Sequence, residues 1–167
     1  MSEYPLSQVS PTDKTTLAEI DALLQKEGIR RDGNLDYICA MFDEDYHVIG
    51  TGSCFGNTLR CFAVSSDHQG EGLLNQIITH LIEVQCARGN LHLFLYTKGK
   101  SSKFFGDLGF YEIARVEDTL VFMENRRDGF GAYLRGLEKT KTEGRSAALV
   151  MNANPFTLGH QYLVETA

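Results

Sequence analysis

The sequence has no apolar segment long enough to span a bilayer, which argues against an integral membrane protein. Its first residues, Met1 to Pro5, lack both the basic patch and the apolar core of a secretion signal. We therefore expect a cytoplasmic protein with no membrane partner.

Positive charge is also scarce. The 167 residues include 16 Lys and Arg against 22 Asp and Glu, which gives a formal net charge of -6. Nonspecific binding of nucleic acids depends on clustered Lys and Arg, so a polynucleotide partner is not expected.

The four cysteines show no C-x-x-C spacing. They are Cys39, Cys54, Cys61 and Cys86, and each lies in an apolar stretch. In a cytoplasmic protein this pattern predicts reduced core residues rather than disulfide partners or zinc ligands. No metal site is predicted.

The composition, 43% hydrophobic and 23% charged, is typical of a globular domain. Ser10 and Pro11 indicate a capped helix start, and Gly28 a helix end. The hydrophobic pattern predicts an antiparallel meander of strands at 36–43, 47–55 and 59–65. It then predicts a helix at 72–88, a strand at 91–96, a short helix at 101–107, and strands at 111–115 and 119–123. We interpret 1–124 as one domain, 125–144 as a connecting helix or linker, and 145–167 as the start of a second domain.

A glycine-containing loop, Gln69 to Asn75, joins a predicted strand to the long helix. The free amides of the first helical turn and the positive end of the helix dipole meet there, which suits a pyrophosphate. Two glycines alone are weak evidence, because ordinary strand-to-helix turns also use them.

The order of helix, meander, Q-x-x-G loop, helix, strand and Leu108-Gly109-Phe110 resembles the GNAT acetyltransferase superfamily over about residues 1 to 124. The resemblance implies an α/β (α+β) fold with a mixed, mostly antiparallel sheet flanked by helices. It also implies that coenzyme A lies along the strand before the loop, with its pyrophosphate on the loop amides. The residues implied are Ala63, Val64, Ser65, Glu71, Gly72, Leu73, Leu74 and Asn75.

Two positions depart from that pattern. Leu74 stands where the superfamily usually has Gly or Ala. Phe105 stands where many members have the tyrosine that protonates the departing thiolate, and a phenyl ring has no proton to donate. Tyr96 or Tyr111 could substitute, although an aromatic residue in a strand more often belongs to the core. The site is therefore predicted to bind a coenzyme-A-like arm better than it transfers an acetyl group to an amine.

A second site follows the apolar run Ala147 to Met151, which predicts a buried strand of a parallel sheet. Thr157-x-Gly159-His160 then resembles the (H/T)-x-G-H signature of the nucleotidyltransferase superfamily. The resemblance implies a truncated Rossmann-like domain in which His160, with Thr157, contacts ATP phosphates and stabilises the transition state. The nucleotide-binding residues implied are Asn152, Asn154, Phe156 and Gly159.

The combination of a GNAT-like part with Asn152-Ala153-Asn154-Pro155-Phe156-Thr157-Leu158-Gly159-His160 resembles the bacterial citrate lyase ligases. Members of that family are ATP-dependent acid–thiol ligases, which convert acetate and ATP, with Mg²⁺, to acetyl-adenylate. They then acetylate the thiol of the coenzyme-A-derived prosthetic group on the citrate lyase acyl-carrier subunit. We expect the chain to be a fragment of such a protein without ligase activity of its own. The alternatives are an acetyl-coenzyme-A-dependent N-acetyltransferase and a non-catalytic scaffold.

Overall fold

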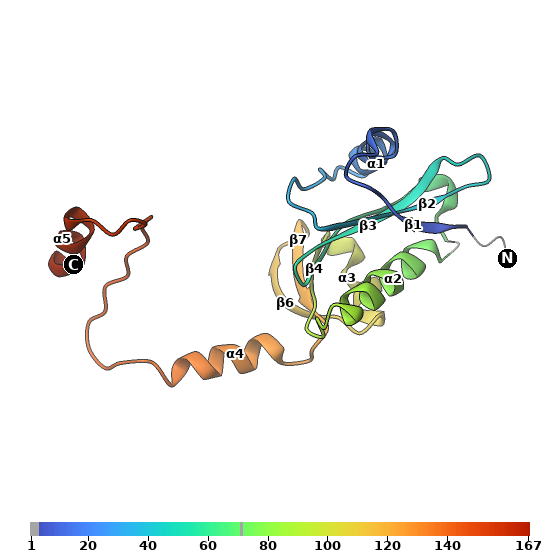
Figure 1. Cartoon of the computed structure of the whole chain (residues 1–167). Coiled ribbons are helices and arrows are strands. Elements are labelled where there is room, and N and C mark those ends of the chain that lie inside the picture. The colour runs from blue at the N-terminus through green and yellow to red at the C-terminus, as the bar shows by residue number, and fades with distance from the viewer. Residues whose placement is uncertain (1–3, 71) are drawn as a thin grey trace. The chain divides into compact units, whose positions relative to one another are not determined.

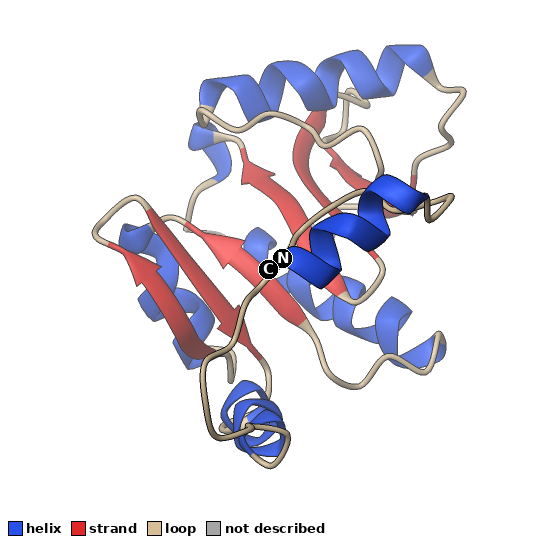
Figure 2. Ribbon diagram, turned by 90° about the vertical axis from the view of Figure 1, so that its left-hand side faces the viewer, coloured by secondary structure: helices blue, strands red, loops and turns tan. Residues whose placement is uncertain are grey.

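The computed structural model describes residues 4–70 and 72–167. The chain forms two compact units, Met1–Gly131 and Ala132–Ala167. The first unit contains a sheet with helices on both faces (Figures 1 and 2). The second contains most of α4 (Gly129–Glu138) and all of α5 (Leu158–Thr166).

Seven strands of the described chain form one sheet, in the order β1-β2-β3-β4-β5-β7-β6. Their bounds are β1 Leu6–Gln8, β2 Tyr37–Phe42, β3 Val48–Phe55, β4 Thr58–Val64, β5 Phe94–Thr97, β6 Tyr111–Val116 and β7 Leu120–Glu124. The β2-β3-β4 meander predicted from the sequence is confirmed. Strand β1, which pairs with β2, was not predicted.

The parallel contact between β4 and β5 is short. The two strands pair at Thr58 with Phe94 and at Leu59 with Leu95, and no later residues pair. All other neighbouring strands are antiparallel. The later part of β4 therefore has a strand partner on its β3 side alone.

Helix α1 (Lys14–Lys26) begins later than the sequence pattern predicts. Asp13, not Ser10, caps it: the Asp13 carboxylate accepts hydrogen bonds from Thr16 N at 3.1 Å and Thr16 Oγ1 at 2.7 Å. The Ser10 hydroxyl instead lies 2.8 Å from Thr12 Oγ1. The Ser10 hydroxyl also accepts the Thr12 amide, at 3.3 Å, but the regular helix starts only after Asp13.

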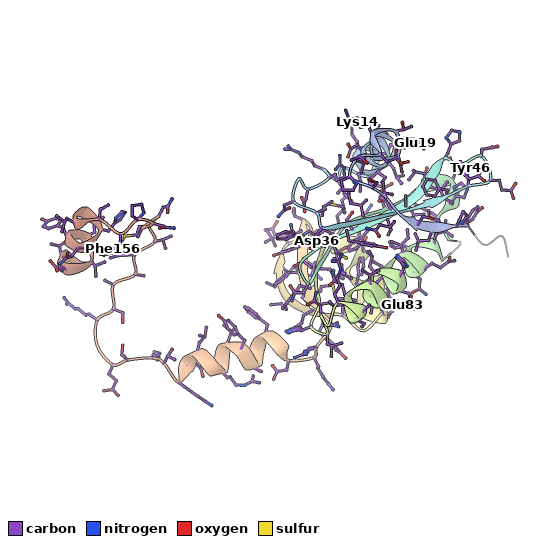
Figure 3. The ribbon with its side chains drawn as sticks, viewed as in Figure 1. Lys14, Glu19, Asp36, Tyr46, Glu83 and Phe156 are labelled. Atoms are coloured by element: carbon purple, nitrogen blue, oxygen red, sulfur yellow. The ribbon has the colours of Figure 1, made fainter. Side chains whose placement is uncertain are left out.

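Each face of the sheet is covered by an amphipathic helix. Helix α1 packs Ile20 and Leu24 on one face, and α2 (Leu73–Ala87) packs Ile77 and Leu81 on the other. Lys14 on α1 and Glu83 on α2 lie on the outer sides of these helices (Figure 3).

Two strand glycines let α2 approach the sheet closely. A Cβ at Gly50 or Gly52 of β3 would lie 2.8 Å or 2.6 Å from side-chain carbons of Ile77. Real side chains are not this close, so any larger residue would push the helix outward.

The cysteine prediction is confirmed for Cys39 and Cys54, which are buried and free. Cys61 and Cys86 are also free, but the prediction that they are core residues is wrong for Cys86, which is exposed, and only partly right for Cys61, which is half-buried. Cys86 belongs to α2, but it lies outside the stripe of buried residues that ends at Gln85.

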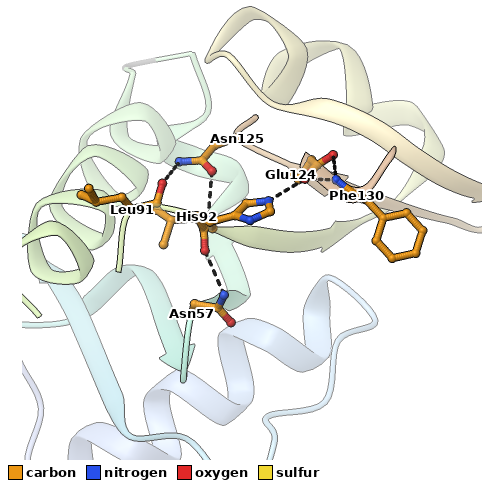
Figure 4. Close-up of polar contacts among 7 residues, drawn as sticks. Asn57, Leu91, His92, Glu124, Asn125 and Phe130 are labelled. Carbon is orange, nitrogen blue, oxygen red and sulfur yellow. Dashed lines mark hydrogen bonds and ion pairs between the residues drawn. The ribbon is translucent and has the colours of Figure 1, made fainter. Parts of the chain in front are cut away.

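A polar cluster fastens the start of α4 to the end of β7 (Figure 4). The buried Glu124 carboxylate contacts His92 Nε2 at 2.5 Å and accepts the Phe130 amide at 2.9 and 3.0 Å. Asn125 joins it by accepting the Leu93 amide at 2.8 Å. The cluster supplies partners for a carboxylate that could not otherwise be buried.

The predicted strand at Ala147 to Met151 is not formed. Leu149 is 46% exposed and Val150 fully exposed, and no strand in the described part of the chain pairs with them. An apolar run becomes a strand only when a neighbour supplies hydrogen-bond partners. Among the described helices, none has the length and apolar character needed to cross a membrane.

Candidate functional site

A cavity of about 1040 Å³ lies where β4 leaves β5. The end of β4 and the first turn of α2 both line it, so the cavity wall combines residues of a strand with residues of a helix. Six of the eight residues implied for coenzyme binding are in its wall: Ala63, Val64, Gly72, Leu73, Leu74 and Asn75. Ser65 is not in the wall, and Glu71 lies outside the described residues.

The β4 wall offers unpaired backbone groups. Ser65 N donates to Ile49 O at 2.8 Å, so the polar groups of Ser65 face β3. Because backbone groups alternate in an antiparallel pair, the N–H and C=O of Val64, opposite Gly50, face the other way. Pairing with β5 has ended by then, so these groups face the cavity and can bind an extended polar ligand.

The α2 wall offers helix amides. Gly72 is the N-cap residue, with φ +75° in the left-handed region, and Gly70 has φ +92°. Residues with a side chain rarely adopt these backbone conformations, so the turn requires glycine at both positions. Gly72 has no side chain to cap the amides of Leu73, Leu74 and Asn75, and the positive end of the helix dipole lies there. An anion would be stabilised at this turn.

The cavity floor is apolar where an acetyltransferase would have its acid. Phe105, on α3 (Ser102–Asp107), is 2% exposed. Its ring centroid lies 5.6 Å from that of Phe62 and 5.2 Å from that of Phe104. The substitution seen in the sequence thus places a buried hydrocarbon, not a hydroxyl, in this wall.

Neither strand tyrosine is a core residue, contrary to the sequence expectation. Tyr96 is 45% exposed, stacks on Phe122 at 4.6 Å and lines the cavity. Tyr111 is 43% exposed and is not among the lining residues. Tyr111 belongs to β6, the edge strand of the sheet, in which five of the six residues are exposed.

The cavity is positively charged although the chain is acidic. Its charged lining residues are Arg30, Arg60, Lys98, Lys100, Glu27 and Asp32, an excess of two positive charges. Arg60 pairs with Asp32 at 3.0 Å, and Lys98 Nζ donates to the carbonyl oxygen of Glu27. Cys61 also lines the cavity, and burial raises the pKa of its thiol. A positive cavity in an acidic protein favours an anionic ligand.

The position of these cations around one cavity was not predicted from the sequence. Lys98 and Glu27 are 71 residues apart, and Arg60 and Asp32 are 28 apart, so no local motif connects them. The end of α1, β4 and the segment after β5 meet at one cavity, and this arrangement brings them together.

The second predicted site lies at the start of α5. Thr157 is the N-cap of α5, and its amide donates to His160 Nδ1 at 3.0 Å. The Thr157 hydroxyl lies 2.8 Å from the same nitrogen. An acceptor of an amide N–H carries no proton, so in the neutral ring the proton is on Nε2. His160 therefore offers Nε2–H as a donor, the form in which a histidine can bind a phosphate oxygen.

The other residues predicted to bind the nucleotide are on the surface of the second unit. Phe156, 60% exposed, lies with its ring centroid 5.7 Å from that of His160 (Figure 3). Asn152, Asn154 and Gly159 are exposed and precede or open α5. The structure brings Thr157, His160 and Phe156 together, whereas within the described residues the side chains of Asn152 and Asn154 do not join this group.

Comparison with known proteins supports the resemblance. Residues 146–167 match the family model described as the citrate lyase ligase C-terminal domain. A citrate lyase ligase of Klebsiella pneumoniae is 36% identical over 156 residues, which cover 93% of this chain and 45% of that protein. One from Escherichia coli is 33% identical over 162 residues, covering 96% and 46%. The chain spans about half the length of the curated relatives it matches.

Solved structures share the fold of the first unit. Escherichia coli ElaA matches with a TM-score of 0.64 and 12% identity, over 74% of this chain and 100% of that one. The GNAT N-acetyltransferase YhbS from Escherichia coli, in complex with CoA, matches with a TM-score of 0.55 and 17% identity, over 75% and 83%. The expected GNAT fold is thus confirmed. Over most of its length the chain is similar in sequence to the citrate lyase ligases, and it spans about half of the length of those relatives.

Proposed function

We propose that the first unit binds the pantetheine arm and the pyrophosphate of a coenzyme-A-type ligand in the cavity between β4 and α2. The observation that carries the proposal is geometric. The unpaired backbone groups of Val64 and the uncapped amides of Leu73 to Asn75 line one cavity. An arm with amides along its length and a pyrophosphate at its end fits these two walls.

Each part of such a ligand has a matching wall. The amides of the arm extend β4 by hydrogen bonding to Val64, as an added strand would. The pyrophosphate lies at the α2 N-terminus, where backbone N–H groups and the helix dipole stabilise negative charge. The related fold of YhbS was solved with CoA, which supports this choice of ligand.

In the whole protein, we infer, this arm is the prosthetic group of the citrate lyase acyl-carrier subunit. The relatives are named as ligases of citrate lyase, which supports this partner. ATP with Mg²⁺ would activate acetate as acetyl-adenylate, and the thiol of the arm would accept the acetyl group. His160, held by Thr157 with its Nε2–H free, would donate to phosphate oxygens in that first step.

Calorimetric titration with coenzyme A, dephospho-coenzyme A and acetyl-coenzyme A tests the arm site. We expect binding of all three, with preference for the dephospho form because it resembles the prosthetic group. Preference for acetyl-coenzyme A, together with acetylation of amines, would instead favour an N-acetyltransferase. The absence of both heat and thermal stabilisation would favour a scaffold, because a ligand that binds the folded state alone must stabilise it.

A pair of variants on α2 locates the site. Asn75→Glu places a carboxylate in the cavity wall, where it repels a pyrophosphate but suits the helix N-terminus. Gln76→Glu places the same charge on the next, exposed residue, which does not line the cavity. We expect Asn75→Glu to weaken binding at least about tenfold and Gln76→Glu to change it little. Equal affinities in the two variants would contradict the site.

A further inference from the structure

Lys98 lies across the cavity from the part of β4 that the arm would follow. It is three residues beyond Leu95, the last residue of β5 that pairs with β4. Ala63 is four residues beyond Leu59, but β4 contains an irregularity near Cys61, whose φ is +54°, which takes up one residue. Because parallel strands rise equally, Lys98 and Ala63 are at about the same level. Both residues line the cavity.

The ammonium group of Lys98 is held in place with donors to spare. Its Nζ donates to the carbonyl oxygen of Glu27, at the C-terminal end of α1, which favours a positive charge. An ammonium has three N–H donors, so two remain for a ligand. Within the described chain no carboxylate forms an ion pair with Lys98.

The other charged groups around the cavity do not neutralise Lys98. Asp32 is paired with Arg60 at 3.0 Å, and Glu27 meets Lys98 through its backbone oxygen. Arg30 and Lys100 add further positive charge to the lining. The environment of a ligand group next to Lys98 is therefore positive.

The Phe105 side of the wall gives no proton to the ligand. Phe105 is buried against Phe62, so a thiolate formed here would meet no hydroxyl from that side. In acetyltransferases a hydroxyl at this position protonates the thiolate that leaves. A thiol that accepts an acyl group must instead lose its proton, because the thiolate is the nucleophile.

We propose that Lys98 stabilises the thiolate of the bound arm and so activates it as an acyl acceptor. The inference rests on the proposed function. In the step, the S–H bond breaks, the electron pair stays on sulfur and the proton passes to solvent. An opposite charge within about 4–6 Å lowers the pKa of an acid by about 1–3 units, so the bound thiol becomes at least about tenfold richer in thiolate near neutral pH.

The test follows the thiol itself. Coenzyme A labelled with ¹³C at the carbon next to sulfur is bound at saturation, and its chemical shift is followed against pH. We expect the bound thiol to titrate at least about one pH unit below free coenzyme A. Lys98→Met should return the pH at which the thiol titrates to that of free coenzyme A, and Lys98→Arg should keep this pH low. Lys103→Met, an exposed lysine on α3 outside the cavity, is the matched control.

The outcomes separate this inference from the proposed function. Binding with a thiol that titrates as in free coenzyme A, in the unaltered protein, overturns the role of Lys98 and leaves the arm site intact. If the bound thiol titrates at the same low pH in Lys98→Met, the role of Lys98 is also overturned. No binding by calorimetry overturns the arm site, and the role of Lys98 with it. If Lys98→Met does not fold, the unaltered protein and Lys98→Arg still give a decisive result.

Discussion

The rings of Phe105 and Phe62 lie with their centroids 5.6 Å apart, which joins α3 to β4 beneath the cavity. Their contact makes the floor of the proposed arm site part of the hydrophobic core. A site built in this way depends on the packing of the fold rather than on a mobile loop.

Phe105→Ala should therefore destabilise the first unit strongly. Removing a buried phenyl ring typically lowers the free energy of unfolding by about 3–5 kcal/mol. Tyr111→Ala is the control, because that ring is 43% exposed and its loss should cost less than about 1 kcal/mol. Urea denaturation measures both. A loss below about 1 kcal/mol for Phe105→Ala would show that the floor is not packed as described.

Gly129→Ala should disturb the contact between His92 and Glu124. A Cβ at Gly129 would lie 2.5 Å from Glu124 Oε2 and 2.7 Å from His92, so the buried carboxylate must move away from its partners. Loss of such partners costs about 1–3 kcal/mol. Gly106→Ala on α3 meets open space, so it should be neutral or slightly stabilising. Thermal unfolding of the two variants gives the comparison, and equal melting temperatures would contradict it.

Stability should fall at alkaline pH. Burial raises the pKa of the Cys39 thiol from its ordinary 9.0 to about 12, and burial also raises the pKa of Tyr37. The folded state then holds protons that the unfolded state has released. The contribution of the protonated Cys39 thiol to the free energy of unfolding is complete below about pH 9, decreases above it, and is lost as the pH passes about 12. Urea unfolding at pH 8, 9.5 and 10.5 checks this, with Cys39→Ala expected to show a shallower decline. A flat profile would contradict it.

His160 should carry its ring proton on Nε2 when neutral. The Thr157 amide donates to Nδ1 at 3.0 Å, which leaves that nitrogen unprotonated. Long-range ¹H–¹⁵N correlation spectra distinguish the two nitrogens directly. Thr157→Pro, which removes the amide proton, should allow the Nδ1–H form to appear. A dominant Nδ1–H form in the unaltered protein would be incompatible with the hydrogen bond described.

Much of the first unit could be predicted from local patterns. Ile77 and Leu81 recur at helical spacing and are buried against β3 as that spacing implies. Gly70 and Gly72 marked the turn that opens α2, and both adopt left-handed backbone. These features depend on neighbouring residues, which is why the sequence reveals them.

The features that were missed depend on contacts between distant residues. Lys98, just after β5, meets Glu27 because the end of α1 borders the same cavity, and His92, just before β5, meets Glu124 at the end of β7. The predicted strand at Ala147 failed for the complementary reason. Its apolar pattern is clear, but no strand in the described chain lies beside it to complete the hydrogen bonds.

The central claim is that an arm of coenzyme A lies along β4 with its pyrophosphate at the start of α2. Backbone amide shifts of this 18.7 kDa chain, followed by NMR during titration with coenzyme A, test it most directly. We predict the largest, saturable changes at Val64 and at Leu73, Leu74 and Asn75. Saturable changes confined to other parts of the chain, or no changes at all, would contradict the account.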